Sequence, residues 1–423
     1  MIRWLLLCLI LAVSSPAVAQ TTAPKSPFEI RVQELVGILQ SGGRESEFFA
    51  PSFLKAIPAS QIREIADSLI AQNGDVIGVE KIELRGAQSG VISMGYAKAT
   101  ILINMTIEAT PPSQVIGLLI TSVITRDDGA DKIRAEVQAL PGHATLLVQP
   151  VGGAPILSVD ADREQAIGSS FKLWLLAEAA RAVAKGERHW SDVIPLGPPG
   201  LPSGIIQAWP KSSPMTLHSL ATLMISISDN TATDTLLFAL GRERVGRMVA
   251  NTGHAAAART LPILSTTEAF ALKMDQSADL RRPFQTGNLA ARTAVLNQNL
   301  SRLGVGSIDN TQLAGPPRFI ESVEWFASPK DMARTLDWLR VNGGKDVLAI
   351  LAVNPGVSKA DADRFAYLGY KGGSETGVIA LNFLVRTKSG AWYTVTGSWN
   401  NPDAAVDDKK FTALMSRALR LIP

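Results

Sequence analysis

A serine and a lysine three residues apart, Ser169 and Lys172, open a long apolar run. On a helix, side chains at this spacing share a face, so the hydroxyl and the amine are expected to lie close together. A serine hydroxyl is a weak nucleophile, and a buried lysine with a lowered pKa can remove its proton. These residues alone leave an alternative open, in which Ser169 is an N-cap and Lys172 extends to the surface.

Two other short motifs contain groups that could complete such a site. The first, Ser228-Asp229-Asn230, follows an apolar helical pattern and places a second serine beside an amide and a carboxylate. Its structural alternative is a turn between helices, with Asp229 or Thr231 as the cap. The second, Lys371-Gly372-Gly373, starts an apolar hairpin, where the lysine can attract a substrate carboxylate and the glycines let a ligand lie against the strand.

Ser-x-x-Lys, Ser-Asp-Asn and Lys-x-Gly in this order resemble the motifs of serine β-lactamases and penicillin-binding proteins. The segment from Met224 to Asp234, and the separation of Ser169 from Ser228, are similar to class A β-lactamases. The resemblance covers about residues 144–423 and implies an α+β fold, an antiparallel sheet flanked by helices. With Val323–Ser328, the layout also resembles the β-lactamase-like serine hydrolase of clavulanic acid biosynthesis.

The resemblance implies a separate role in catalysis for each of these residues. Ser169 would be the acylated nucleophile, and Lys172 would be its proton acceptor or part of the proton relay. Ser228, helped by Lys371, would pass a proton to the leaving nitrogen. The backbone N–H groups of Ser169 and Ser374 would form an oxyanion hole, and a nucleophile at a helix N-terminus favours developing negative charge.

The resemblance also implies substrate-binding residues, namely Asn230, Lys371, Gly373 and Ser374. Asn230 would orient both Lys172 and a substrate amide. The third motif departs from the family pattern, because Gly372 stands where the family usually has threonine or serine. Either Ser374 or Thr376 replaces the missing hydroxyl, or the substrate lacks the carboxylate that it would hold.

The base that activates water for hydrolysis of the acyl-enzyme is harder to assign. Class A enzymes hydrolyse the acyl-enzyme with a glutamate in a Glu-x-x-Leu-Asn loop, and no such motif follows Ser228. The nearest candidate, Glu268, forms with Ser265 a capping-box pattern, which is the favoured interpretation. Glu324 and Glu375 are weaker candidates. Without general-base help, which is worth about 10²–10⁴-fold, hydrolysis of the acyl-enzyme would be slow.

The N-terminal residues 1–19 predict a secretory signal peptide, with a charged start, a short apolar core and an Ala-x-Ala site. We therefore expect an exported protein, periplasmic or secreted, with no transmembrane segment after cleavage. The single cysteine, Cys8, lies inside this signal. The mature chain is thus expected to contain neither disulfides nor thiol chemistry.

Two domains are expected after the signal. Residues 25–140 read as helices followed by β-branched strands, which predicts a small α+β domain. The resemblance suggests that it is like steroid isomerases or polyketide cyclases, and the residues themselves assign it no function. Residues 141–423 form the expected β-lactamase-like domain.

Charge and composition argue against several classes of function. A net charge of +3, with scattered basic residues, gives no support for nucleic-acid binding. The four histidines lack metal-ligand spacing, so no metal and no cofactor is expected. The prediction is a serine hydrolase that opens β-lactams or cleaves related esters or amides of small molecules. The alternatives are an esterase or penicillin-binding peptidase with slow deacylation, and a non-catalytic ligand-binding module.

Overall fold

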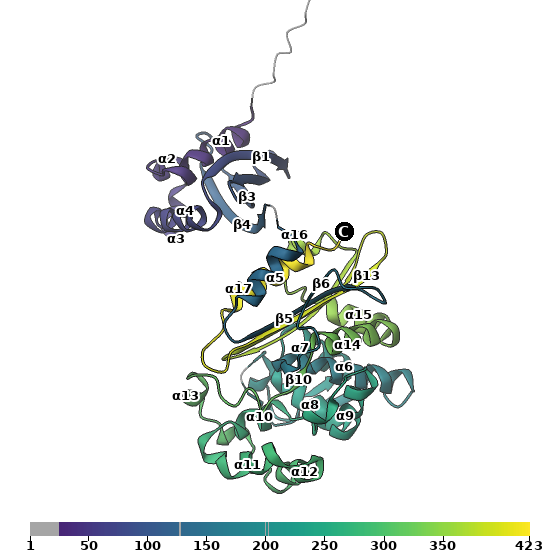
Figure 1. Ribbon diagram of the computed structural model, residues 1–423. Helices are drawn as coiled ribbons and strands as arrows, with labels where there is room; N and C mark the ends of the chain where they lie inside the picture. The colour runs from purple at the N-terminus through teal and green to yellow at the C-terminus, as the bar shows by residue number, and fades with distance from the viewer. Residues whose placement is uncertain (1–24, 127, 199, 202) are drawn as a thin grey trace, which may run out of the picture. The chain divides into compact units, whose positions relative to one another are not determined.

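The computed structural model describes residues 25–126, 128–198, 200–201 and 203–423. The expected signal peptide lies outside them. The chain divides into two compact units, Met1–Val123 and Ile124–Pro423 (Figure 1). The expected boundary after residue 140 therefore moves towards the N-terminus. The reason is helix α5 (Ala130–Gln138), which buries Ile133 and Val137 against the sheet of the second unit.

The first unit has the expected α+β composition, with four helices and a four-stranded antiparallel sheet in the order β1-β2-β3-β4. Helix α1 begins with a capping box between Ser26 and Glu29, and it buries Phe28, Val32 and Leu35. The likeness to an isomerase or cyclase stays a prediction. The elements are α1 (Pro27–Gln40), α2 (Glu45–Phe48), α3 (Pro51–Ala56), α4 (Ala59–Asn73), β1 (Val76–Leu84), β2 (Ser89–Tyr96), β3 (Ala99–Ile107) and β4 (Val115–Thr125).

The second unit contains a five-stranded antiparallel sheet in the order β11-β12-β13-β5-β6, so β11 is an edge strand. Its strands come from both ends of the unit, which brings residues 143–159 beside residues 367–400. The strands are β5 (His143–Pro150), β6 (Leu157–Val159), β11 (Tyr367–Glu375), β12 (Val378–Arg386) and β13 (Trp392–Asn400). The expected hairpins are confirmed.

Helices cover both faces of this sheet (Figure 1). Helices α5 and α17 (Asp408–Leu419) lie on one face, and the other face carries α14 and α15 with the helical layer behind them. The remaining elements are β7 (Gln165–Ala166), η1 (Gly168–Phe171), α6 (Lys172–Ala184), β8 (Val193–Pro195), η2 (Ile206–Ala208), β9 (Pro214–Thr216), α7 (Leu217–Ser226), α8 (Asn230–Leu240), α9 (Arg242–Asn251), η3 (Ala257–Arg259), α10 (Thr266–Leu272), η4 (Asp275–Ser277), α11 (Ala278–Thr286), α12 (Leu289–Gln298), η5 (Val305–Ser307), α13 (Asn310–Leu313), β10 (Phe326–Ala327), α14 (Pro329–Asn342), α15 (Gly344–Ala352) and α16 (Lys359–Ala362).

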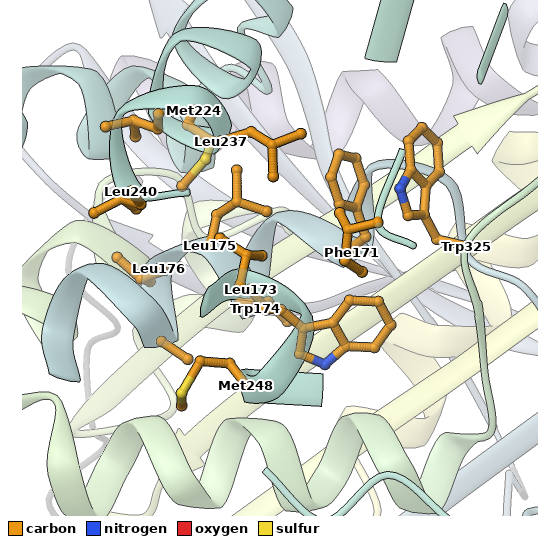
Figure 2. Packing of buried hydrophobic residues seen from close by; sticks show 14 of the residues in the cluster. Phe171, Leu173, Trp174, Leu175, Leu176, Met224, Leu237, Leu240, Met248 and Trp325 are labelled. Carbon is orange, nitrogen blue, oxygen red and sulfur yellow. The ribbon is translucent and has the colours of Figure 1, made fainter. Parts of the chain in front are cut away.

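Helix α6 lies at the centre of the helical layer. Its side chains from Lys172 to Ala180 are all buried, as expected for a helix that is apolar all round. Figure 2 shows Leu173, Trp174 and Leu175 among residues of the surrounding elements. None of the described helices is long and apolar enough to cross a membrane. Because the first residues of α6 are buried on every side, core packing fixes the position of Ser169.

Candidate active site

Ser169 lies in the 3-10 helix η1, one turn before α6, rather than inside the α-helix that the sequence predicts. The ring of Phe171 stacks on Trp325 with 3.9 Å between centroids (Figure 2), and the N–H of Ile167 donates to the carbonyl of Trp325 at 3.0 Å. These contacts fix both ends of the short helix. Ser169 itself is only partly buried. The serine is thus a rigidly held group at the edge of a solvent-accessible space.

Lys172 does not extend to the surface, which excludes that alternative. Its side chain is fully buried, and its Nζ donates to the Ser228 carbonyl at 2.7 Å and the Asn230 Oδ1 at 2.8 Å and lies 3.0 Å from the Ser228 Oγ. Burial, followed by the positive charge of Lys371, holds the pKa of Lys172 well below its usual value. A neutral lysine amine can accept a proton, so the site contains a base of the kind that Ser169 requires.

Ser228 sits in the left-handed backbone region, with φ of +58°, an uncommon conformation that clusters at functional sites. Asp229 caps α8 by accepting from the N–H of Ala232 at 2.9 Å, so the capping alternative is also correct. The carbonyl of Ser228 accepts from the Ser203 hydroxyl at 3.0 Å. This pattern of bonds points the Ser228 hydroxyl at two amines, those of Lys172 and Lys371.

Lys371 reaches the same hydroxyl from the edge strand β11. Its Nζ lies 3.1 Å from Ser228 Oγ and also donates to the carbonyl of Gly372. Its side chain is buried, and this burial lowers the pKa of Lys371 to about 7. Ser228 therefore connects two amines whose pKa values are both lowered.

Strand β11 crosses the backbone of the nucleophile so closely that only glycine fits at position 373. An added Cβ there would lie 2.3 Å from the Ser169 nitrogen and 2.4 Å from the Ile167 carbonyl oxygen. The nitrogen of Ser374 lies in the same region, 3.2 Å from an ideal Cβ on Gly168. The structure thus brings the backbone nitrogens of Ser169 and Ser374 to one place. Their use as an oxyanion hole stays a prediction.

Two hollows meet at the nucleophile, and both are lined by Ser169, Ser203 and Ser374. The lysine hollow, of about 390 Å³, is lined in addition by Ser228 and Lys371. The glutamate hollow, of about 370 Å³, is lined by a set of polar and apolar residues that includes Asn230, Trp325, Glu324 and Glu375. A substrate bound across both hollows would pass directly over Ser169.

The sequence of residues 129–345 matches the model of a protein family described as the β-lactamase enzyme family. This match spans half of the chain and includes Ser169, Lys172, Ser228 and Asn230. The chain belongs to the β-lactamase enzyme family. The matched range ends before Lys371, so the third motif is supported by the geometry alone.

Solved structures that are similar to this chain share low sequence identity with it. A β-lactamase from Sphaerobacter thermophilus DSM 20745 is 22% identical, with a TM-score of 0.47, over 69% of this chain and 94% of its own. PBP-A is 18% identical, with a TM-score of 0.46, over 69% and 93%. A β-lactamase from Desulfarculus baarsii DSM 2075 is 18% identical, with a TM-score of 0.46, over 69% and 96%. A search of curated proteins found no match.

Glu268 is not placed to activate water, although the sequence makes it the nearest candidate in this family member. Its carboxylate accepts from Arg242 at 2.6 and 2.8 Å and from the Ser265 N–H at 2.8 Å. The N–H of Glu268 donates to the Ser265 hydroxyl at 3.1 Å, which completes a capping box at the start of α10. Glu268 lines neither hollow. The favoured capping interpretation is confirmed, and these contacts give no support to Glu268 as the base.

Glu324 and Glu375 do line the glutamate hollow, but both are tied to one buried cation. The Nζ of Lys273 donates to Glu324 Oε1 at 2.6 Å and also to Glu375. Burial and the negative charge of Glu324 raise the pKa of Glu375 well above its usual value. Both carboxyl groups are therefore committed to the contact with Lys273. We call these three residues the Lys273 cluster.

The sequence analysis missed Ser203 and Lys273. Ser203 lies in an irregular segment and has no motif of its own. Lys273 is separated from Glu324 and Glu375 by about fifty and about a hundred residues, so no local pattern connects them. The only signal in the sequence for this cluster was that Glu324 and Glu375 were weaker candidates for the base.

One group of side chains among the described residues resembles a metal site, namely Glu164, His254 and Asp331. Both ring nitrogens of His254 are already used: Nδ1 accepts from the Ala256 N–H at 3.1 Å, and Nε2 lies 2.7 Å from the Phe326 carbonyl. Asp331 accepts from the N–H of Ala255 and caps α14. The group joins three segments of the fold and offers no free histidine lone pair.

Proposed function

We propose that the protein is an exported serine hydrolase, in which Ser169 attacks a β-lactam or a related ester or amide and is acylated. The observation that carries this proposal is the environment of Lys172, a fully buried amine bonded to Ser228 and Asn230 and placed three residues after the serine. A binding module would not need this arrangement, because burial of an amine without a carboxylate partner is costly. Export rests on the sequence of residues 1–19.

In the acylation step, the neutral amine of Lys172 takes the proton of the Ser169 hydroxyl, and the oxygen attacks the substrate carbonyl. The N–H groups of Ser169 and Ser374 stabilise the negative oxygen of the tetrahedral intermediate. The Ser228 hydroxyl then gives its proton to the leaving nitrogen or oxygen, and it is reprotonated from Lys172 or Lys371. The carbonyl–leaving-group bond breaks, and the acyl group stays on Ser169.

Hydrolysis of the acyl-enzyme is proposed to be slow. The two carboxyl groups that line the glutamate hollow both contact Lys273, and burial and the charge of Glu324 raise the pKa of Glu375. Neither is a free base for water, and general-base help is worth about 10²–10⁴-fold. This observation favours an esterase or penicillin-binding peptidase with a long-lived acyl-enzyme over a fast β-lactamase.

The test is to incubate the mature protein with benzylpenicillin, a chromogenic cephalosporin and a simple ester, and to follow protein mass and product together. We expect a lasting adduct on Ser169 with little product, and no adduct in Ser169→Ala. A transient adduct with rapid product release would identify a true lactamase or esterase. The absence of an adduct and of turnover with all three compounds would overturn the proposed function.

A further inference from the structure

Tyr370 and Gly372 lie two residues apart on β11, on the sheet face that carries α17, while Lys371 points to the opposite face. The Tyr370 ring packs against Phe383, with 4.9 Å between centroids. An ideal Cβ on Gly372 would lie only 2.1 Å from the Tyr370 hydroxyl oxygen. The tyrosine hydroxyl therefore stands where a side chain at position 372 would otherwise be.

A second glycine holds the ring in this position from the other side. An ideal Cβ on Gly356 would lie 2.5 Å from Cδ1 of Tyr370, and Gly356 has a φ of +65°, which itself favours glycine. The ring is thus enclosed by Gly356, Gly372 and Phe383. This enclosure leaves the hydroxyl little freedom to move away from the edge of the strand.

The Tyr370 hydroxyl is a free donor that faces the lysine hollow. Tyr370 and Gly372 both line this hollow, and among the described residues no hydrogen bond to this hydroxyl is formed. By contrast, the hydroxyl of Tyr367 on the same strand donates to the Leu348 carbonyl at 2.9 Å. Burial, with the negative charge of Asp408, raises the pKa of Tyr370 to about 12, so it remains a donor at neutral pH.

The charges around this hydroxyl do not favour an anion. Lys371 is the one cationic side chain among the described residues that line the lysine hollow. Its amine already contacts Ser228 and the Gly372 carbonyl, and burial lowers the pKa of Lys371 to about 7. Asp408, the first residue of α17, lines the same hollow. A substrate carboxylate here would meet little positive charge and one carboxylate.

We propose that Tyr370 is a substrate-binding residue whose hydroxyl takes the place of a side chain at position 372. This hydroxyl selects substrates that place an uncharged hydrogen-bond acceptor in the lysine hollow. An ester or amide carbonyl satisfies the phenolic donor without bringing a negative charge beside Asp408. The inference rests on the proposed function, because it assigns a substrate class to the lysine hollow beside Ser169.

The test compares benzylpenicillin with its methyl ester, in which the carboxylate is replaced by an uncharged ester, by the rate at which each acylates Ser169 in the full-length mature protein. Wild type should react faster with the ester. Tyr370→Phe keeps the ring packing and should slow the ester reaction about three- to tenfold, the size of one neutral hydrogen bond. Tyr367→Phe, which removes a hydroxyl from the same strand away from the hollow, should leave the ester-to-acid ratio unchanged.

Two further variants separate a substrate contact from a structural effect. Gly372→Thr should slow the reaction, because the new Cβ would overlap the Tyr370 oxygen. Tyr370→Ala/Gly372→Thr returns a hydroxyl to the hollow and should recover most of the ester rate lost in Tyr370→Ala. Adducts that form with an unchanged rate in Tyr370→Phe, or a faster reaction with the free acid in wild type, would overturn this inference only. No adduct in any variant would overturn the proposed function, and this inference with it.

Discussion

The three buried lysines near Ser169 have different hydrogen-bond partners, and their pKa values shift in different directions. Lys172 and Lys371 share the hydroxyl of Ser228, and none of the hydrogen bonds found for either joins it to a carboxylate. Lys273, buried to the same degree, lies between Glu324 and Glu375. Burial lowers the pKa of the first two, whereas the two carboxylates raise the pKa of Lys273 above its usual value.

The comparison shows that partners, rather than burial, decide whether a buried amine is a base or a structural cation. A lysine that faces only neutral oxygen acceptors loses its proton easily and can do chemistry. A lysine between carboxylates keeps its proton and holds segments together, here α10, the strand edge at Glu375 and the segment before β10. Three of the predictions below remove a member of one group or change its charge.

The largest expected effect follows from replacing Lys172. Lys172→Met has a similar volume and no proton acceptor, so acylation of Ser169 should fall by about 10²–10⁴-fold, the usual size of a general-base contribution. The free energy of unfolding should stay level or rise, because a buried polar amine becomes an apolar group. Rapid-mixing mass spectrometry measures the first effect and urea unfolding the second. An acylation rate equal to that of wild type would remove Lys172 from the mechanism.

Lys273→Met should behave in the opposite way. Removing this cation leaves Glu324 and Glu375 buried without a partner, which we expect to lower the free energy of unfolding by about 3–5 kcal/mol. The triple variant Lys273→Met/Glu324→Gln/Glu375→Gln removes the charges together and should recover much of this loss. Urea unfolding at pH 7 compares the two. Equal stability of Lys273→Met and wild type would contradict the assignment of a structural ion pair.

The motif residues of the candidate site could be predicted from sequence because each lies in a short pattern with its own local reason. Ser169 and Lys172 are one turn apart, and Lys371 lies next to two glycines within a strand. The hairpins and the capping box at Ser265 are equally local. Such features depend on a few neighbouring residues, so the linear pattern contains them.

Features that depend on the path of the whole chain could not be predicted. The Lys273 cluster joins three segments that only tertiary folding brings together. The apolar face of α5 predicts burial, but it does not say which of two sheets will cover Ile133 and Val137. The proposed role of Tyr370 was missed for a different reason, since it depends on the absence of a side chain at Gly372, whose place the tyrosine hydroxyl takes.

The pH dependence of acylation tests the electrostatic coupling between the two catalytic lysines. The pKa of Lys172 is lowered in part by the positive charge of Lys371. Acylation requires neutral Lys172, so the rate should rise with pH as that amine loses its proton. Lys371→Met removes the charge and should raise the pKa of Lys172, which moves the acid limb of the pH–rate profile to higher pH. Lys371→Arg keeps the charge and should leave the limb in place. Identical limbs in both variants would show that the amines are not coupled.

The smallest effect is expected for Glu268→Gln, which tests whether this carboxylate takes part in hydrolysis of the acyl-enzyme. Its carboxylate caps α10 and binds Arg242, so Glu268→Gln should cost only about 1–2 kcal/mol of unfolding free energy, the range for loss of a helix cap. The lifetime of the acyl-enzyme should not change, because neither hollow is lined by Glu268. Time-resolved protein mass measures that lifetime, with Ser265→Ala as a control that weakens the same cap and leaves the carboxylate in place. An acyl-enzyme that persists longer in Glu268→Gln, but not in Ser265→Ala, would show that this carboxylate reaches the catalytic water after all.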